Sequence, residues 1–107
     1  GPAHDEALIC LSEMGSAVAA NGDVAQGEEL VRRALSGFMQ THGADHLLTA
    51  TTRRNLAAIL ATRGLLDEAA AEYRAALEVY RAELAPDNPS IKMIRDNLQR
   101  LEASRQP

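Results

Sequence analysis

Apolar residues recur at three- and four-residue steps along most of the chain, and this spacing predicts amphipathic α-helices rather than strands. The pattern is interrupted at Asn21-Gly22, at residues 41–45, at Arg63-Gly64 and at residues 85–89, where glycines and prolines favour the end of a helix. We therefore expect an all-α chain of about five helices, over residues 4–20, 24–42, 48–62, 66–84 and 90–104. Asp23 and Ser90 are placed to cap the second and fifth of these helices.

Each expected helix carries one apolar stripe that should face a common core. Gly27 and Ala34 lie on the second stripe, and their small size allows another helix backbone to approach closely. Cys10 lies in the apolar stretch of the first helix, so we expect a buried, reduced and inert thiol. The expected stripes are Leu8, Leu11, Met14 and Val18; Val24, Gly27, Val31, Ala34, Leu35 and Phe38; Leu48, Leu56, Ile59 and Leu60; Leu66, Ala69, Ala70, Tyr73, Ala76, Leu77 and Tyr80; and Ile91, Ile94, Leu98 and Leu101.

The sequence matches itself when it is shifted by 42 residues. Glycine, aspartate and asparagine recur at this interval as well as alanine and leucine, as in the pairs Gly22/Gly64, Asp45/Asp87 and Asn55/Asn97. A single helical hairpin cannot cover its own apolar face, so consecutive hairpins should stack. We expect one domain over residues 3–107, with a first unit (4–45), a second unit (46–87) and a capping helix (90–104). Gly1-Pro2 is typical of the remnant of a removed tag.

The residues of the second unit resemble the tetratricopeptide repeat family, in the 42-residue form typical of kinesin light chains. Asn55-Leu56-Ala57, Leu60, Gly64, Ala69, Tyr73 and Ala76-Leu77 make a nearly complete signature of that family. The segment 84–89, Leu-Ala-Pro-Asp-Asn-Pro, is similar to the Leu-Gly-Pro-Asp-His-Pro connection of the longer form, and the resemblance extends over residues 4–101.

This resemblance implies a right-handed superhelical stack of antiparallel helix hairpins, with two repeat units and a C-terminal capping helix. It also implies a concave groove, lined by the leading helix of each unit, that binds peptides or partner proteins without catalysis. In the kinesin light chain form an asparagine before the signature leucine holds the peptide backbone, which corresponds here to Asn55 and Asn97. The groove candidates are Ile9, Ser12, Glu13, Ser16, Thr51, Arg54, Asn55, Ala58, Met93, Asp96, Asn97 and Arg100.

Three features depart from the family pattern or admit a second interpretation. An asparagine within a helix also bonds to a neighbouring helix or to water, so a structural role for Asn55 and Asn97 is an equal alternative. Arg53 and Arg95 stand where the family usually has large apolar residues, which indicates shifted leading helices or ion pairs with acids on the following helix. The lysine, asparagine and arginine clamp of chaperone-binding members is not reproduced.

Composition narrows the classes of partner. The formal net charge is −4, whereas a nucleic-acid-binding domain typically presents a strongly basic face. No apolar run reaches the roughly 20 residues of a membrane helix, and no secretory signal is recognisable. A single cysteine cannot form an intrachain disulfide. We expect a cytoplasmic module that binds protein, not nucleic acid or membrane.

The chain offers little for catalysis or cofactor binding. His42 and His46 are four residues apart beside Asp45, a spacing that binds a metal on one helix, but Gly43 should break the helix between them and leave a solvated loop. No phosphate-binding glycine loop and no serine or cysteine beside a base is present, so we expect neither an enzyme nor a cofactor.

Two functions remain. The first is an adaptor that binds a partner segment in its groove through Asn55, Asn97, Arg54 and Arg100. The second is a structural unit of a larger regulatory protein, which contacts itself or other repeats through its terminal helices, because about three repeats are usually needed for a stable solenoid.

Overall fold

The computed structural model describes residues 1–105 and contains five α-helices in that range. They are α1 (Pro2–Ala20), α2 (Val24–Thr41), α3 (Leu47–Thr62), α4 (Leu66–Glu83) and α5 (Pro89–Arg105). The expected helices are confirmed to within a few residues at each end, and residues 1–105 contain no strand. Pro107, the expected end of the domain, lies outside the described residues.

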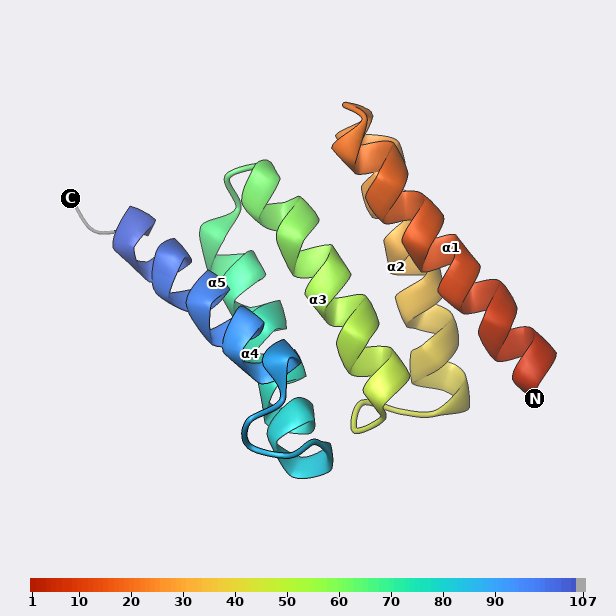
Figure 1. The fold of residues 1–107 in the computed structure, drawn as a ribbon. Coiled ribbons are helices and arrows are strands. Elements are labelled where there is room, and N and C mark those ends of the chain that lie inside the picture. Colours follow the sequence, from red (N-terminus) through yellow and green to blue (C-terminus); the bar gives the residue numbers. More distant parts are fainter. Residues whose placement is uncertain (106–107) are drawn as a thin grey trace.

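The helices form two layers. Figure 1 shows α1, α3 and α5 side by side in the front layer, with α2 and α4 behind them. Helices α1 and α2 pair as one antiparallel hairpin and α3 and α4 as the next, while α2 also packs against α3, and α4 against α5. The expected stack of hairpins with a terminal capping helix is confirmed, and its leading helices share one face.

Short-range signals explain most helix ends. The Asp23 side chain accepts a hydrogen bond from the Gln26 amide and caps α2, as expected. Gly22, Gly43 and Gly64 follow α1, α2 and α3 with positive φ angles of 110°, 81° and 79°.

The expectation that Ser90 caps the last helix is wrong. Helix α5 begins one residue earlier, at Pro89, and the Asn88 side chain accepts a hydrogen bond from the Ser90 amide at 2.9 Å. Proline suits this position because the first turn of a helix needs no donor from it and its φ angle is already helical. Asn88 therefore takes the capping role.

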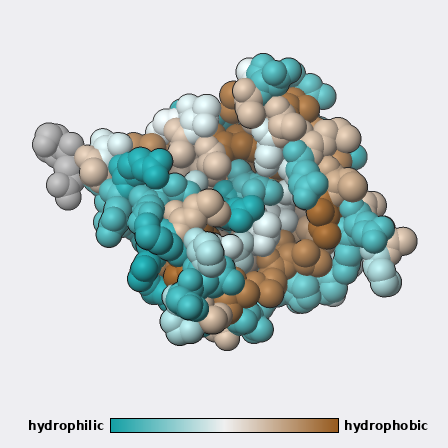
Figure 2. All heavy atoms as spheres, in the orientation of Figure 1, coloured by the Kyte–Doolittle hydropathy of each residue, from teal (hydrophilic) through white to brown (hydrophobic). Residues whose placement is uncertain are grey.

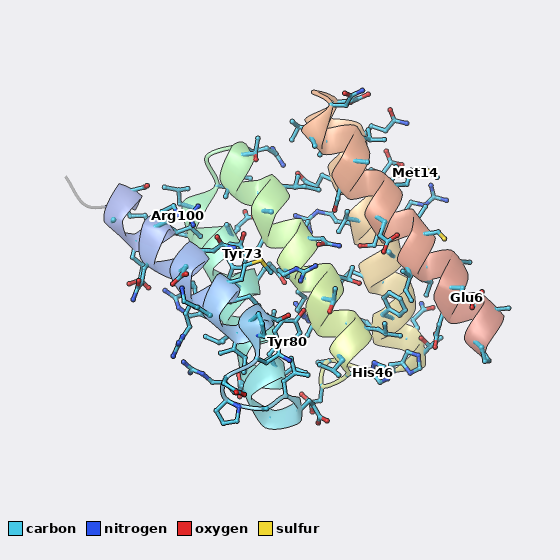
Figure 3. The ribbon with its side chains drawn as sticks, viewed as in Figure 1. Glu6, Met14, His46, Tyr73, Tyr80 and Arg100 are labelled. Atoms are coloured by element: carbon cyan, nitrogen blue, oxygen red, sulfur yellow. The ribbon has the colours of Figure 1, made fainter. Side chains whose placement is uncertain are left out.

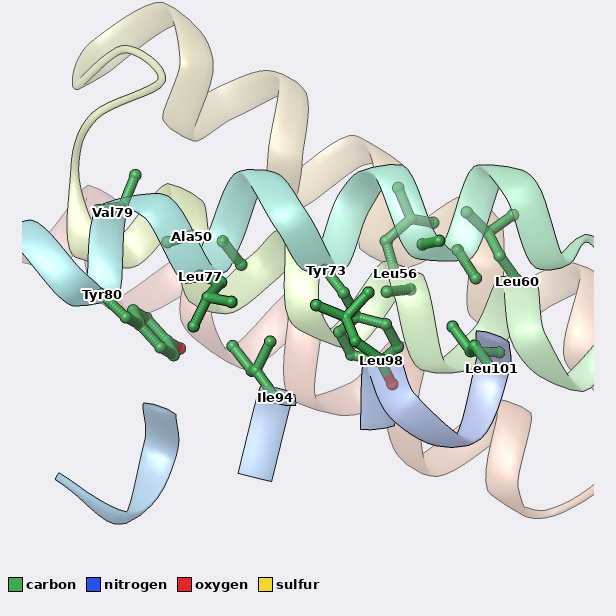
Figure 4. Packing of buried hydrophobic residues seen from close by; sticks show 14 of the residues in the cluster. Ala50, Leu56, Leu60, Tyr73, Leu77, Val79, Tyr80, Ile94, Leu98 and Leu101 are labelled. Atoms are coloured by element: carbon green, nitrogen blue, oxygen red, sulfur yellow. The ribbon is translucent and has the colours of Figure 1, made fainter. Parts of the chain in front are cut away.

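The core is continuous from α2 to α5. Val31 belongs to it from α2, and the aromatic residues of α4 pack with the apolar side of α5. Figure 4 shows Tyr73, Leu77 and Tyr80 of α4 facing Ile94, Leu98 and Leu101 of α5. The expected role of α5 is thus confirmed, because it covers the apolar face that α4 would otherwise expose to water.

The first hairpin is held by a backbone contact through glycines. A Cβ atom on Gly15 of α1 would lie 2.7 Å from the carbonyl oxygen of Gly27 in α2 and 2.7 Å from a methyl group of Val31. Such distances leave no room for a side chain. The expected close approach at Gly27 is confirmed, and Gly15 is its partner.

The expected core side of α1 is wrong in part. Ser12 and Gly15 are the buried residues of α1, whereas Met14 is 54% exposed and Leu8, Leu11 and Val18 are only half-buried. Cys10 is exposed and not a core thiol. Gly15 brings α1 against α2 and Ser12 bonds to Asn55 of α3, which leaves Cys10 and Met14 on the opposite side of the helix.

Within residues 1–105, no helix combines the length and the apolar character needed to cross a bilayer.

Candidate functional site

A cavity of about 270 Å³ opens between α1 and α3 on the face formed by the leading helices. Its walls come from one side of each of these helices, Leu48 at the start of α3 adds apolar surface, and the fully buried Phe38 of α2 lies beneath. Figure 2, which views this face, shows polar surface crowded over α5 and more apolar surface toward α1. A volume near the lower limit for small-molecule sites suits a few side chains of a bound segment.

The structure brings seven of the twelve groove candidates together in this cavity. From α1 these are Ile9, Ser12, Glu13 and Ser16, and from α3 they are Thr51, Arg54 and Asn55. Phe38, Leu48 and Thr52 also border the cavity and are not among the groove candidates. The spacing of Phe38 in α2 indicates a core residue, and this is confirmed, because the side chain is fully buried beneath the opening.

Polar contacts fix the cavity walls relative to each other. The Asn55 side-chain amide donates a hydrogen bond to the Ser12 hydroxyl at 2.9 Å, which links α3 to α1. The hydroxyls of Thr51 and Tyr80 bond at 2.7 Å and link α3 to α4. Asn55 thus has the structural bond of the alternative interpretation while its side chain also faces the cavity.

The cavity contains both signs of charge. Glu13 is exposed on α1, and Arg54 is half-buried on α3, where its guanidinium lies 3.4 Å from the Asn55 carbonyl oxygen. A partner that places an acid near Arg54 and a base near Glu13 would match this polarity.

A second cavity, of about 300 Å³, lies between α3 and α5. It contains three further groove candidates, Ala58, Asn97 and Arg100, together with Tyr73 of α4. Burial raises the pKa of Tyr73, and the positive charges of Arg54 and Arg100 act in the opposite direction. Figure 3 shows Tyr73 and Arg100 close to one another beside α5. The tyrosine therefore keeps its proton at neutral pH and lies in a positive field.

The remaining two candidates line neither of these cavities. Met93 is 44% exposed, and the Asp96 carboxylate pairs with Lys92 at 3.0 Å, one turn earlier on α5. Both lie on α5, away from the cavity between α1 and α3.

Arg53, which departs from the family pattern, has an ionic partner. Its guanidinium donates to the Glu72 carboxylate at 2.8 Å, and both side chains are about one-fifth exposed. The expectation of a pair with an acid on the following helix is confirmed for Arg53. The aliphatic part of the side chain occupies the place of an apolar residue while its charge is paired.

The two histidines between α2 and α3 organise the loop that joins them. Their rings stack with centroids 4.1 Å apart. His42 Nε2 lies 2.9 Å from the Asp5 carboxylate, and His46 Nδ1 accepts a hydrogen bond from the Leu48 amide at 3.0 Å. Among residues 1–105, no group of three histidine, cysteine or acidic side chains is arranged to hold a metal ion.

Comparison with known proteins adds one match. Residues 6–82 match the family model described as tetratricopeptide repeat, a span that includes nearly all of both hairpins. No curated protein matches the sequence.

Proposed function

The chain belongs to the tetratricopeptide repeat family, whose domains generally mediate protein–protein interaction, and we propose that it binds an extended or helical segment of a partner protein in the groove between α1 and α3. The observation that carries this proposal is the cavity between these helices, with accessible apolar surface from Ile9 and Leu48 and with Glu13 and Arg54 on its walls. Apolar contacts supply affinity and the two charges supply orientation.

The preferred ligand has an apolar side chain that contacts Ile9 and Leu48 and an acidic group for Arg54. Arg100 and Asn97 extend the polar surface toward α5 and give a longer segment further contacts. The 42-residue interval, with a positive-φ glycine after both α1 and α3, supports the kinesin-light-chain-like form. The single cysteine, which has no partner for an intrachain disulfide, supports a cytoplasmic location.

The test is a selection of binding peptides from a random library, followed by affinity measurement on charge variants. Glu13→Lys changes the groove, and Glu29→Lys makes the same change on an exposed position of α2. We expect peptides selected on the unaltered chain to lose about tenfold or more in affinity for Glu13→Lys and to keep their affinity for Glu29→Lys. Glu13 is a suitable position for the substitution because its side chain is exposed. A variant of Asn55 would be ambiguous, because it would also remove the hydrogen bond from Asn55 to Ser12.

If the selected peptides bind Glu13→Lys and Arg54→Ala as well as they bind the unaltered chain, the groove is not the binding surface. Thermal unfolding of each variant shows whether a loss of binding reflects a loss of fold.

A second candidate function is that of a structural unit that packs through its terminal helices on a second copy or on other helices. The exposed Met14 and Cys10 on α1 favour it, because an apolar helix face in water is a usual sign of an interface. Light scattering over a wide concentration range distinguishes self-association, which gives a mass that rises with concentration, from a monomer.

A further inference from the structure

Four residues on the exposed side of α1 form a continuous stripe, and none of them is charged. Ala7, Cys10, Met14 and Ala17 follow one another at three- and four-residue steps, so they share one side of the helix. All four are exposed. Figure 3 shows that Met14 points away from α3, as does Glu6 near the start of the helix. We call these four residues the open face of α1.

The 42-residue repeat shows what covers the same face elsewhere in the chain. In α3 the equivalent residues are all at most 4% exposed, and in α5 they are at most 9% exposed. These are Thr49, Thr52, Leu56 and Ile59 in α3, and Ile91, Ile94, Leu98 and Leu101 in α5. The same face is therefore buried twice within the chain and exposed once.

An α-helix provides the cover in both buried cases. Helix α2 packs on α3, and α4 packs on α5. From α2, Val31 belongs to the shared core and Leu35 packs against it. From α4, Tyr73, Leu77 and Tyr80 belong to it at an i, i+4, i+7 spacing. The open face of α1 continues this series, with the position of the covering helix left free.

From this continuity we infer that the open face of α1 is a docking site for an amphipathic helix of a partner protein that presents large apolar residues at i, i+4 and i+7. This inference is independent of the groove and narrows the second candidate function to one kind of partner. Alanine and cysteine stand where α5 has isoleucine, so the partner side chains must be large to fill the space. The exposed carboxylate of Glu6 on the same side favours a helix with basic flanks.

A second copy of the chain does not offer such a helix. Tyr73, Leu77 and Tyr80, which make the apolar stripe of α4, are already buried against the core. Two open faces could meet only by pairing α1 with α1, which brings Glu6 and Glu13 of both copies into one interface and buries only four small or unbranched apolar side chains from each. We therefore assign the face to a helix of a partner protein.

The probe is a synthetic peptide with the sequence of residues 64–85, in which the exposed Glu68, Glu78 and Glu83 are each replaced by lysine. It carries the stripe of Tyr73, Leu77 and Tyr80 and a basic flank, and it contains no cysteine. Binding is measured with the unaltered chain, with Met14→Glu, and with Met39→Glu as the matched control on an exposed methionine of α2.

We expect saturable binding that Met14→Glu weakens about tenfold or more and that Met39→Glu leaves unchanged. The new glutamate also separates apolar docking from charge attraction, because it would strengthen a merely electrostatic contact with a basic peptide. Cys10, the only cysteine, gives a second readout: bound peptide should slow its alkylation by iodoacetamide about fivefold or more.

Three results would overturn the inference. These are no saturable binding, binding that Met14→Glu does not weaken, and binding that leaves Cys10 as reactive as before. A dimer of the chain that Met14→Glu dissociates would mean that the occupant is a second copy. That result would overturn this inference while supporting the broader structural role.

Discussion

The replacement of Gly27 by alanine should destabilise the protein, although alanine is the better helix former. A Cβ atom at this position would meet the carbonyl oxygen of Gly15, lie 2.6 Å from the Ala19 Cβ and lie 2.8 Å from the Ala19 nitrogen. Two of these three atoms belong to the backbone of α1, which cannot rotate away as a side chain can. The hairpin of α1 and α2 must therefore open to accommodate one methyl group.

The magnitude follows from two opposing contributions. Alanine gains about 1 kcal/mol over glycine in a helix interior. Overpacking costs about 1–3 kcal/mol where neighbours can adjust, and a backbone contact lies at or above the upper end of that range. We expect Gly27→Ala to lower the free energy of unfolding by about 2 kcal/mol.

Gly37→Ala is the matched control, because it makes the same chemical change in the same helix. Its Cβ atom would lie 2.8 Å from the two terminal methyl carbons of Leu8, a half-buried side chain that can adopt another rotamer. We expect this variant to be neutral or up to about 1 kcal/mol more stable, since it keeps the helix-propensity gain.

The assay is urea unfolding followed by circular dichroism. With a slope of about 1–3 kcal/mol per molar urea for a small domain, a loss of about 2 kcal/mol lowers the midpoint by about 1 M. If Gly27→Ala is as stable as Gly37→Ala, then α1 and α2 are not in close contact at Gly27. The orientation of α1 that exposes Met14 would then also be wrong.

Three further predictions use the same unfolding measurement. Gly64→Ala should cost about 1 kcal/mol, because φ is 79° at this position and the left-handed region is unfavourable for alanine; an unchanged midpoint would contradict this. Asn55→Ala and Ser12→Ala should show a coupling of about 1 kcal/mol in a double-mutant cycle, and additive losses would mean that the 2.9 Å bond contributes nothing. For Glu28, burial raises the pKa, but hydrogen bonds from Arg32 and Arg63 outweigh it and hold the pKa below its ordinary value. Because the pKa of Glu28 is lower in the folded chain than the ordinary 4.5, its carboxylate stabilises the fold above pH 4.5. This contribution is lost as the pH falls through the pKa of the folded state. Glu28→Gln should therefore be less stable than the unaltered chain at pH 7, and the difference should disappear in acid.

The helices could be predicted from sequence because their signals are local. Asp23 caps α2, and Gly22 and Gly64 end helices with positive φ, as residue type and spacing indicate. The start of α5 is harder to predict because Asn88 and Ser90 are both capping residues, and the preference of Pro89 for the first turn decides between them.

The grouping of the groove candidates is also a consequence of helix periodicity. Ser12 and Ser16 share a side of α1, and Thr51 and Asn55 share a side of α3, so a pairing of these helices brings them together. Periodicity does not reveal which polar side chains are used within the fold. The bonds from Asn55 to Ser12 and from Thr51 to Tyr80 join helices that are far apart in sequence, and they depend on how α1, α3 and α4 are packed.

The expectation that Met14 is buried fails for a different reason, which concerns the open face of α1. Met14 belongs to a helical apolar stripe, and its repeat equivalents Leu56 and Leu98 are core residues, so its pattern indicates burial. The apolar pattern indicates that this side of the helix is suited to burial, but it does not indicate which helix buries it. For Leu56 and Leu98 the preceding helix of the chain provides it, whereas for Met14 the described residues provide none. The position where sequence and structure disagree is therefore the position where a partner helix fits, and the response of peptide binding to Met14→Glu decides whether one docks there.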